Sequence, residues 1–497
     1  MRSSDSSLIF EKVIFAYDDR PTPVLEDLSL SLGPGWTCVA GPNGSGKTTF
    51  ALLACGILKP DSGSISRPEP TAYCAQRVDR PPTGVGELLA DGGSDELRGV
   101  LGVRSDWPDR WDRLSLGERR RLQAWVALEG DPGLLVLDEP TNHLDAEAKR
   151  ILAESLARFR GVGVLVSHDR DFADAICRAT LLLPEWRVFD ASLSTALEIR
   201  DEEARAARER RKESEREVAR LSGTARSARS AEERSARSGS KSRLDPRDRD
   251  GKARIDLARM TGRDAVAGRA RRRMEDRVAR ARAELDGSRA SLGRKEGLAI
   301  PSTPSKRDAL ATAGPGTIAL GPDRSVFLPE LRLGPLDRVG LRGANGSGKS
   351  TLLRALAADA GVRGVDLAYI PQDLGEEEGA RGVAEARAAG NDPLARAMSQ
   401  LYLLGSDPEA LLSSAAPSPG EARKLLLALA FARDASLVIA DEITNHLDLT
   451  ALRCLEAALA DYSGALLLAS HDLRFLEACC EIMWTIEGGR LRIERLR

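Results

Sequence analysis

Two stretches of the sequence have the residue types and spacing needed to bind a chain of phosphates. GPNGSGKTT at 41–49 and GANGSGKST at 343–351 both satisfy the pattern G-x-x-x-x-G-K-[ST]. Glycines let backbone N–H groups converge on phosphate oxygens, the lysine neutralises the β- and γ-phosphates, and the next hydroxyl ligates Mg²⁺. We therefore expect two ATP sites, whose phosphate-contacting residues are Gly41, Asn43, Gly44, Gly46, Lys47, Thr48 and Thr49, and Gly343, Asn345, Gly346, Gly348, Lys349, Ser350 and Thr351.

An acidic pair follows an aliphatic run in two places, LLVLDE at 134–139 and LVIADE at 437–442. Asp138 and Asp441 would stand at the carboxyl end of a buried strand, where a carboxylate can hold the shell of a Mg²⁺ ion. Glu139 and Glu442 come directly after and are placed to orient or deprotonate a water that attacks phosphate. The pattern predicts hydrolysis as well as binding of ATP.

All four histidines of the chain lie in repeated motifs. His143 and His446 lie in two copies of TNHLD, and His168 and His471 in two copies of SHD. His168 and His471 each end an aliphatic run 30 residues after the motif aspartate, a position suited to sensing a γ-phosphate. We predict these two histidines as catalytic residues together with the two motif glutamates.

The elements that must position these residues occur twice. Lys47 and Lys349 are 302 residues apart, and the two motif aspartates are 303 apart. Within each copy, short aliphatic runs typical of strands buried in a parallel sheet alternate with helical stretches. We expect an α/β protein with two P-loop domains, at 1–190 and 301–497, joined by an α-helical hairpin linker at 191–300.

The linker differs in composition from the two copies. Residues 200–296 carry 30 Lys and Arg against 19 Asp and Glu, although the whole chain has a net charge of −2, and 190–325 contain no aromatic residue. Helix-forming residues predict helices at 197–221 and 262–296. In the second of these helices a narrow apolar stripe suits an antiparallel partner, and its residues are Met274, Val278, Ala281, Leu285 and Leu292.

Two functions fit this linker. It could be a solvated spacer that only tethers the two copies. Alternatively, its tip could bind RNA phosphates through basic residues, a salt-sensitive contact without base stacking because aromatic residues are missing. The basic residues in question are Arg234, Arg237, Lys241, Arg243, Arg247, Arg249, Lys252 and Arg254.

The overall composition argues against secretion and membrane insertion. Seven cysteines form no CxxC pair and their number is odd, which favours reduced thiols in the cytoplasm. The first residues lack an apolar signal core. The longest aliphatic run, 425–432, is much shorter than the roughly 20 residues of a membrane span.

These motifs closely resemble the ATP-binding cassette family. The signature of that family corresponds to LSLGE at 114–118 and PSPGE at 417–421, its Q-loop to Gln76 and Gln372, and its adenine-stacking aromatic to Tyr17. The resemblance implies that two cassettes pack head to tail, so that each ATP lies between the P-loop of one and the signature of the other. The implied signature contacts are Ser115, Gly117 and Glu118 for the second site and Ser418, Gly420 and Glu421 for the first. The implied Mg²⁺ residues are Thr48, Gln76, Asp138, Ser350, Gln372 and Asp441.

Two cassettes with a long charged linker and two TNHLD motifs resemble the ABC-F subfamily in particular. That resemblance implies an ATPase that acts on the ribosome, as a translation factor or in antibiotic resistance by ribosomal protection. The linker would reach toward tRNA and the peptidyl-transferase region, and the protein would be a monomer with paired cassettes. The sequence departs from the family at Leu116 and Pro419 in the signatures and at Ile443. It also has no aromatic residue about 30 positions before Lys349 that could stack on adenine. The two sites could therefore differ in their affinity for ATP or in their rate of hydrolysis.

Two other functions fit the sequence less well. A fused ATP-binding subunit of a transporter with separate membrane subunits fits the cassettes but not the charged linker. A DNA-repair ATPase fits less well, because its coiled coil would interrupt a cassette between P-loop and signature, whereas these segments are uninterrupted here. The sequence leaves open whether the protein serves resistance or ordinary translation, and whether both ATP sites hydrolyse.

Overall fold

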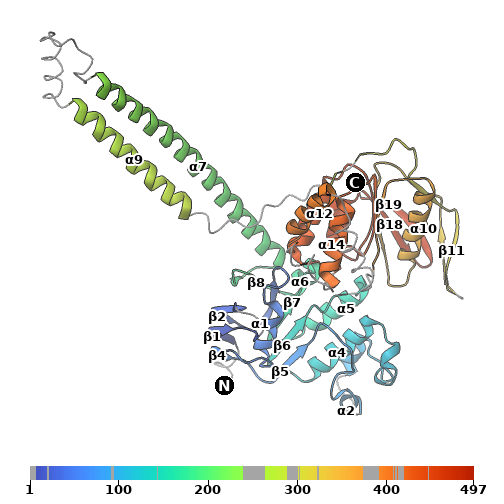
Figure 1. Cartoon of the computed structure of the whole chain (residues 1–497). Helices are drawn as coiled ribbons and strands as arrows, with labels where there is room; N and C mark the ends of the chain where they lie inside the picture. Colours follow the sequence, from blue (N-terminus) through green and yellow to red (C-terminus); the bar gives the residue numbers. More distant parts are fainter. Residues whose placement is uncertain are drawn as a thin grey trace, which may run out of the picture. The chain divides into compact units, whose positions relative to one another are not determined.

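The structure is a computed structural model, shown in Figure 1. It describes residues 7–18, 22–90, 95–142, 144–238, 263–287, 300–301, 303–321, 324–372, 391–406, 408, 411, 419–445 and 447–496. The chain forms two compact units, one made of Met1–Ala196 with Lys295–Arg497 and the other of Leu197–Arg294. We call the parts of the larger unit before and after the linker the first and second repeat, and Leu197–Arg294 the linker unit.

The first repeat is built on a six-stranded sheet in the order β5-β6-β7-β3-β8-β9, whose strands are parallel except for β9. A three-stranded antiparallel sheet, β2-β1-β4, lies beside it. The strands are β1 (Leu8–Phe15), β2 (Leu25–Leu32), β3 (Gly35–Ala40), β4 (Ser62–Ser66), β5 (Thr71–Cys74), β6 (Leu134–Asp138), β7 (Val162–Val166), β8 (Ala179–Leu182) and β9 (Arg187–Phe189).

Helices connect these strands, as parallel pairing requires. They are α1 (Lys47–Ala54), α2 (Val85–Ala90), α3 (Asp95–Leu101), a 3₁₀ helix (Pro108–Arg113), α4 (Leu116–Glu129), α5 (Ala146–Leu156) and α6 (Arg170–Ile176).

The second repeat has an eight-stranded mixed sheet in the order β11-β12-β19-β18-β14-β17-β16-β15 and a two-stranded β10-β13 sheet. Its strands are β10 (Ala311–Ala313), β11 (Gly316–Gly321), β12 (Arg324–Leu328), β13 (Leu331–Leu333), β14 (Arg338–Gly343), β15 (Leu367–Ile370), β16 (Leu437–Asp441), β17 (Ala465–Ala469), β18 (Ile482–Glu487) and β19 (Arg490–Arg495). Its helices are α10 (Lys349–Val362), α12 (Asn391–Leu403), α14 (Pro419–Phe431), α15 (Leu449–Ala460) and α16 (Leu473–Cys479).

The central strands explain why the motif residues gather. Strands β6 and β7 are buried along their whole length, as are β16 and β17, because both faces of a parallel sheet are covered by other elements. The order β6-β7-β3 brings the carboxyl ends of three parallel strands to one edge, and β16-β17-β14 does the same in the second repeat. Ligands bind at this edge of open α/β sheets. The predicted α/β class with two P-loop domains is confirmed.

The linker unit contains two long helices, α7 (Leu193–Ser238), which begins in the larger unit, and α9 (Arg263–Gly287). Figure 1 shows them side by side as a hairpin. Leu221 on α7 and Val278 of the predicted stripe are buried. Helix α7 extends beyond the expected end at 221, because the Ala, Arg and Glu residues that follow are good helix formers. Leu292 and the basic residues at 241–254 lie outside the described residues.

None of the helices described in either unit is both long enough and apolar enough to span a bilayer.

Candidate functional site

The two predicted phosphate loops have the same local structure. Each follows a central strand and leads into a helix, from β3 to α1 and from β14 to α10. The residues before the lysines, Gly46 and Gly348, have φ of 95° and 104°, a left-handed region that favours glycine. A Cβ at Gly46 would also lie 2.8 Å from a methyl carbon of Val24. The loops therefore hold backbone N–H groups at a helix N-terminus, the usual geometry for binding phosphate.

The loop lysines are buried and bend back over their own loops. Nζ of Lys47 donates to the carbonyl oxygens of Gly41 and Pro42, both at 2.8 Å, and Nζ of Lys349 donates to that of Gly343 at 2.7 Å. Burial lowers the pKa of both ammonium groups. A phosphate oxygen could replace a neutral carbonyl as the acceptor of these charged donors, with a stronger, charge-assisted bond.

The acidic pairs stand at the strand ends as predicted. Asp138 ends β6 and Asp441 ends β16, and both are buried. The next residues, Glu139 and Glu442, have φ of 47° and 49°, an unusual conformation for a residue with a Cβ. The same strained backbone at two equivalent positions indicates a site in which side-chain direction matters more than local stability.

Burial dominates the electrostatics of these carboxylates. It raises the pKa of Glu139 to about 8, with the neighbouring Lys47 acting in the opposite direction. Burial also raises the pKa of Asp138, Asp441 and Glu442, because a carboxylate loses the solvation that stabilises its charge. A carboxylate whose pKa is near neutrality is suited to accept a proton at physiological pH.

The SHD histidines face the glutamates. Nε2 of His168 lies 3.3 Å from Oε1 of Glu139, and Nε2 of His471 lies 3.3 Å from Oε1 of Glu442. Burial lowers the pKa of His168 to about 3, so its ring is neutral at physiological pH. In the second repeat Nε2 of His471 also lies 3.3 Å from Nζ of Lys349.

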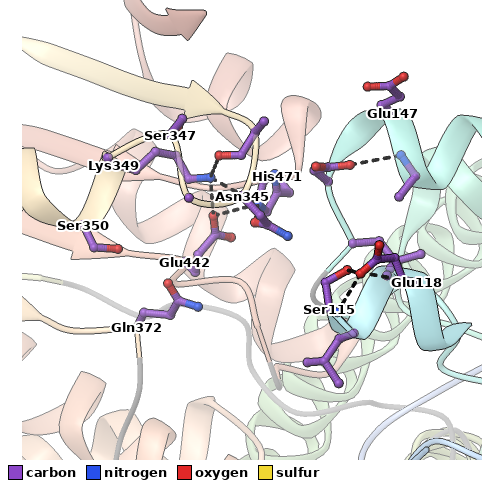
Figure 2. Close-up of a pocket in the computed structure, with 18 of the residues that line it drawn as sticks. Ser115, Glu118, Glu147, Asn345, Ser347, Lys349, Ser350, Gln372, Glu442 and His471 are labelled. Carbon is purple, nitrogen blue, oxygen red and sulfur yellow. Dashed lines mark hydrogen bonds and ion pairs between the residues drawn. The ribbon is translucent and has the colours of Figure 1, made fainter. Parts of the chain in front are cut away.

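Two cavities hold these residues, and each is lined by both repeats. The second cavity, of about 930 Å³, contains the loop of the second repeat opposite Ser115, Gly117 and Glu118 of the first. Figure 2 shows Lys349, Glu442 and His471 on one side of it and Ser115 with Glu118 on the other. This is the juxtaposition that head-to-tail pairing predicts.

The first cavity, of about 1010 Å³, is lined by Tyr17, by Lys47 and other residues of the first loop, and by Gly420 of the second repeat. Glu421 lies in the first turn of α14. Both cavities have the size of small-molecule sites. Three predicted or noted residues, Ser418, His143 and His446, lie outside the described residues.

Most of the remaining predicted residues line the cavity of their own repeat, but Gly41, Gly343 and Asp441 are not among the lining residues. In the first cavity these are Asn43, Gly44, Gly46, Thr48, Thr49, Gln76, Asp138, Glu139 and His168. In the second they are Asn345, Gly346, Gly348, Ser350, Thr351, Gln372, Glu442 and His471.

The N-terminus of α4 shows how a signature serine is held. Ser115 caps the helix by accepting from the backbone N–H of Glu118 at 3.2 Å, and the carboxylate of Glu118 accepts from the backbone N–H of Ser115 at 2.8 Å. This capping box fixes the helix end. It also places the serine hydroxyl in the second cavity.

The two cavities differ where the base of a nucleotide would lie. Tyr17 lines the first, where its hydroxyl lies 3.1 Å from the hydroxyl of Thr49. The second is lined at the corresponding place by Leu320 and Arg324, in keeping with the missing aromatic in the sequence. A Cβ at Gly348 would lie 2.8 Å from a methyl carbon of Leu320, so this leucine packs directly against the phosphate loop.

One buried arginine in each repeat was not predicted from the sequence. Arg120 donates to the carbonyl oxygen of Ala75 at 2.5 Å and to that of Gln76. Arg423 donates to the carbonyl oxygens of Gln372 at 2.7 Å and Asp441 at 3.0 Å. These arginines tie the signature helices to the Q-loops. Each arginine follows the glycine of its signature by three residues. This spacing, repeated in both copies, could have identified the arginines from the sequence.

The donor sets fit a magnesium ion bound with phosphate. Thr48 and Tyr73 hydrogen-bond to Asp138, and Ser350 to Asp441, while Oδ1 of Asp441 is buried and makes no hydrogen bond. Within the described parts of the chain, no cluster of three or more acidic, histidine or cysteine residues could hold a metal by itself. Mg²⁺ typically takes one or two carboxylates and completes its shell with phosphate and water, which these sites allow.

Comparison with known proteins gives consistent results. The model of the ABC transporter family matches residues 25–142 and 329–445. The tylosin resistance ATP-binding protein TlrC of Streptomyces fradiae is 31% identical, over 95% of this chain and 96% of its own length. The energy-dependent translational throttle protein EttA of Mycobacterium tuberculosis is 29% identical, over 96% of this chain and 91% of its own.

Solved structures share the fold. The archaeal ribosome recycling factor aABCE1, in complex with the ribosomal stalk protein aP1, superposes with a TM-score of 0.62 at 17% identity, over 98% of this chain and 90% of its own. An RNase-L inhibitor gives a TM-score of 0.58, also at 17% identity, over 98% of this chain and 91% of its own. At this identity the likeness concerns the fold alone.

Proposed function

The chain belongs to the ABC-F type of tandem ATP-binding cassette ATPases, and from this premise we propose that it acts on the ribosome as an ATP-driven clamp. Its cassettes bind and hydrolyse ATP. In the proposed cycle two ATP molecules hold the repeats together, and the closed form docks on the ribosome. Hydrolysis then separates the repeats and releases the protein.

One observation carries the clamp proposal: each cavity is lined by the phosphate loop of one repeat and by the signature region of the other. A γ-phosphate in such a cavity can accept hydrogen bonds from both repeats at once. Its removal eliminates the bridge between them, a common way for a nucleotide to control a conformational change. We therefore assign the closed state to bound ATP and the open state to ADP.

The proposed reaction uses the glutamate and histidine of each repeat. The carboxylate of Glu139 accepts a proton from the attacking water while the water oxygen bonds to the γ-phosphorus. The bond from that phosphorus to the bridging oxygen breaks, and its electron pair leaves with ADP. His168 would donate from Nε2 to a γ-phosphate oxygen, and Lys47 would neutralise charge at the same group. Glu442, His471 and Lys349 would do the same in the second site.

Mg²⁺ would supply charge neutralisation of the β- and γ-phosphates when bound. We propose that Thr48 and Asp138 hold it in the first site and Ser350 and Asp441 in the second, with Gln76 and Gln372 nearby. The hydroxyls and carboxylates present are hard oxygen ligands of the kind that Mg²⁺ prefers.

The ribosomal part of the proposal rests on the relatives and on the linker. One relative is named a translational throttle protein, and another for resistance to tylosin. The linker carries a net positive charge, which suits contact with RNA phosphates. We propose that the linker reaches toward tRNA and the peptidyl-transferase region. We also propose that the protein is a cytoplasmic monomer. Its domains would be the first cassette at 1–190, the linker at 191–300 and the second cassette at 301–497.

The decisive experiment uses the double variant Glu139→Gln with Glu442→Gln. We expect it to bind ATP, to lose turnover by at least a hundredfold, and to co-sediment with ribosomes through a sucrose cushion when ATP is present. A matched variant, Lys47→Ala with Lys349→Ala, should not sediment. If the glutamine variant stays in the supernatant at moderate salt, the ribosomal role is wrong. If it instead pellets with membranes, a transporter subunit is favoured.

A further inference from the structure

A buried lysine of the second repeat forms an ion pair beside the first cavity. Lys424 lies on α14, and its Nζ is 3.0 Å from Oδ2 of Asp448. The two side chains are only 4% and 2% exposed. A buried ion pair is costly to desolvate and is tolerated when further hydrogen bonds satisfy its atoms. Oδ1 of Asp448 accepts from the backbone N–H of Ala451 at 2.8 Å and so caps α15.

The capped end of α15 contacts the first repeat at two functional places. Oδ2 of Asp448 accepts from the backbone N–H of Asn43, in the phosphate loop, at 3.1 Å. The next residue, Leu449, donates its backbone N–H to Nδ1 of His168 at 3.2 Å. Two consecutive residues of the second repeat thus hold both the loop and the histidine of the first site.

The contact from Leu449 selects the form of the histidine ring. A neutral imidazole carries one proton, on either Nδ1 or Nε2. Because Nδ1 of His168 accepts a hydrogen bond, its proton must be on Nε2. That nitrogen faces Oε1 of Glu139, where the γ-phosphate would lie in the proposed function.

The equivalent position of the first repeat has a different partner. Arg121 stands 303 residues before Lys424. Its Nη1 donates to the carbonyl oxygen of Leu101 at 3.0 Å, and its guanidinium lies over the ring of Trp107 at 5.2 Å. The residue equivalent to Asp448, Asp145, caps α5 through the N–H of Ala148. The lysine–aspartate pair is therefore a feature of one ATP site.

We propose that Lys424 is a positioning residue of the first ATP site, which holds Asp448 so that the end of α15 keeps His168 in its Nε2–H form and Asn43 in place. The inference rests on the proposed function, in which both sites hydrolyse ATP. Pairing of the repeats then has two effects in the first site. It encloses the nucleotide, and it selects the tautomer of His168. The second site lacks the lysine, so loss of Lys424 should affect the two sites unequally.

The first test measures turnover at one site at a time, with purified protein and no ribosomes. In a Glu442→Gln background, Lys424→Met should lower kcat by at least tenfold with less than a threefold change in KM. In a Glu139→Gln background, it should change kcat by less than twofold. The exposed Lys59→Met serves as control for both. Equal losses in the two backgrounds, or no loss in either, would overturn the proposal.

The second test observes the ring directly. The chain has only four histidines, so ¹⁵N-histidine labelling gives four ring spectra, and the set that disappears in His168→Asn belongs to His168. With a non-hydrolysable ATP analogue and Mg²⁺, we expect the Nε2–H form in the parent protein. We expect a mixture of tautomers in Lys424→Met.

Asp448→Asn provides a milder variant, because asparagine can still cap α15. It should give the same mixture of tautomers, whereas an unchanged Nε2–H form in both folded variants would refute the proposal. Neither test uses ribosomes. A failure of the ribosomal role would therefore not alter these results, and the two failures can be told apart.

Discussion

At the scale of single residues, the site places ionisable side chains in a poorly solvated environment. Glu139, Lys47 and His168 are all shifted toward their neutral forms, chiefly by burial. Charged groups in such surroundings interact more strongly with a phosphate than they would in water. Both motif glutamates also have a left-handed backbone conformation, which is unfavourable for a residue with a Cβ. An unfavourable conformation at two equivalent positions indicates function.

The raised pKa of Glu139 leads to a prediction about pH. A general base acts only when it is deprotonated, and burial keeps this carboxyl protonated up to about pH 8. In the Glu442→Gln variant, kcat/KM for ATP should therefore rise with pH, by roughly tenfold between pH 6.5 and 8. Initial rates of phosphate release across this range would measure it. A flat profile would show that Glu139 does not accept the proton in the rate-limiting step.

At the scale of elements, the linker unit depends on few apolar contacts. The described part of this unit is mostly charged, and Leu197, Leu221 and Val278 are its buried hydrophobic residues. An apolar stripe this narrow can hold two long helices together, but it contributes little to the free energy of unfolding of the helical pair.

Replacement of Leu221 by Ala should loosen the helical pair. Deletion of a buried leucine side chain costs roughly 2–5 kcal/mol, which is large for a pair of helices with so few buried apolar residues. We expect hydrogen exchange in α7 and α9 to accelerate at least tenfold, while the sheets of the larger unit keep their protection. Glu213→Ala, at an exposed position of the same helix, is the control. Unchanged exchange in α9 would mean that the helices do not stabilise each other.

At the scale of the whole larger unit, further ion pairs cross between the repeats. Arg170 of the first repeat pairs with Glu456 and lies 3.6 Å from Asp472 of the second. Arg474 of the second pairs with Asp171 at 2.5 Å and Asp174 at 3.0 Å. These partly buried pairs favour association of the repeats in one register, since a shift would leave charges unpaired.

A charge reversal tests whether this register supports nucleotide binding. Glu456→Arg would place a second cation beside Arg170, and we expect the KM for ATP to rise at least fivefold because both half-sites must meet. The double variant Arg170→Glu with Glu456→Arg should recover most of the loss. Steady-state ATPase assays would show this, and failure of the double variant to recover would indicate that the pair has only a local role.

The sequence by itself determined the two ATP sites, their loops and their acidic residues, because phosphate binding needs particular residue types at fixed spacing along one segment. It also determined the α/β class, since buried parallel strands are continuous aliphatic runs. The end of α7 at Ser238 was not predicted, because a polar helix without a core leaves a weak pattern.

Only the tertiary structure decided which residues besides the signature contact the first site from the second repeat. Asp448 contacts Asn43 from 405 positions away and Leu449 contacts His168 from 281 positions away, and no local pattern encodes such contacts. The hydrogen-bonded state of His168 is likewise a property of the folded unit. A side chain's pKa and tautomer depend on what surrounds it in space, and only the packing of one repeat against the other defines those surroundings.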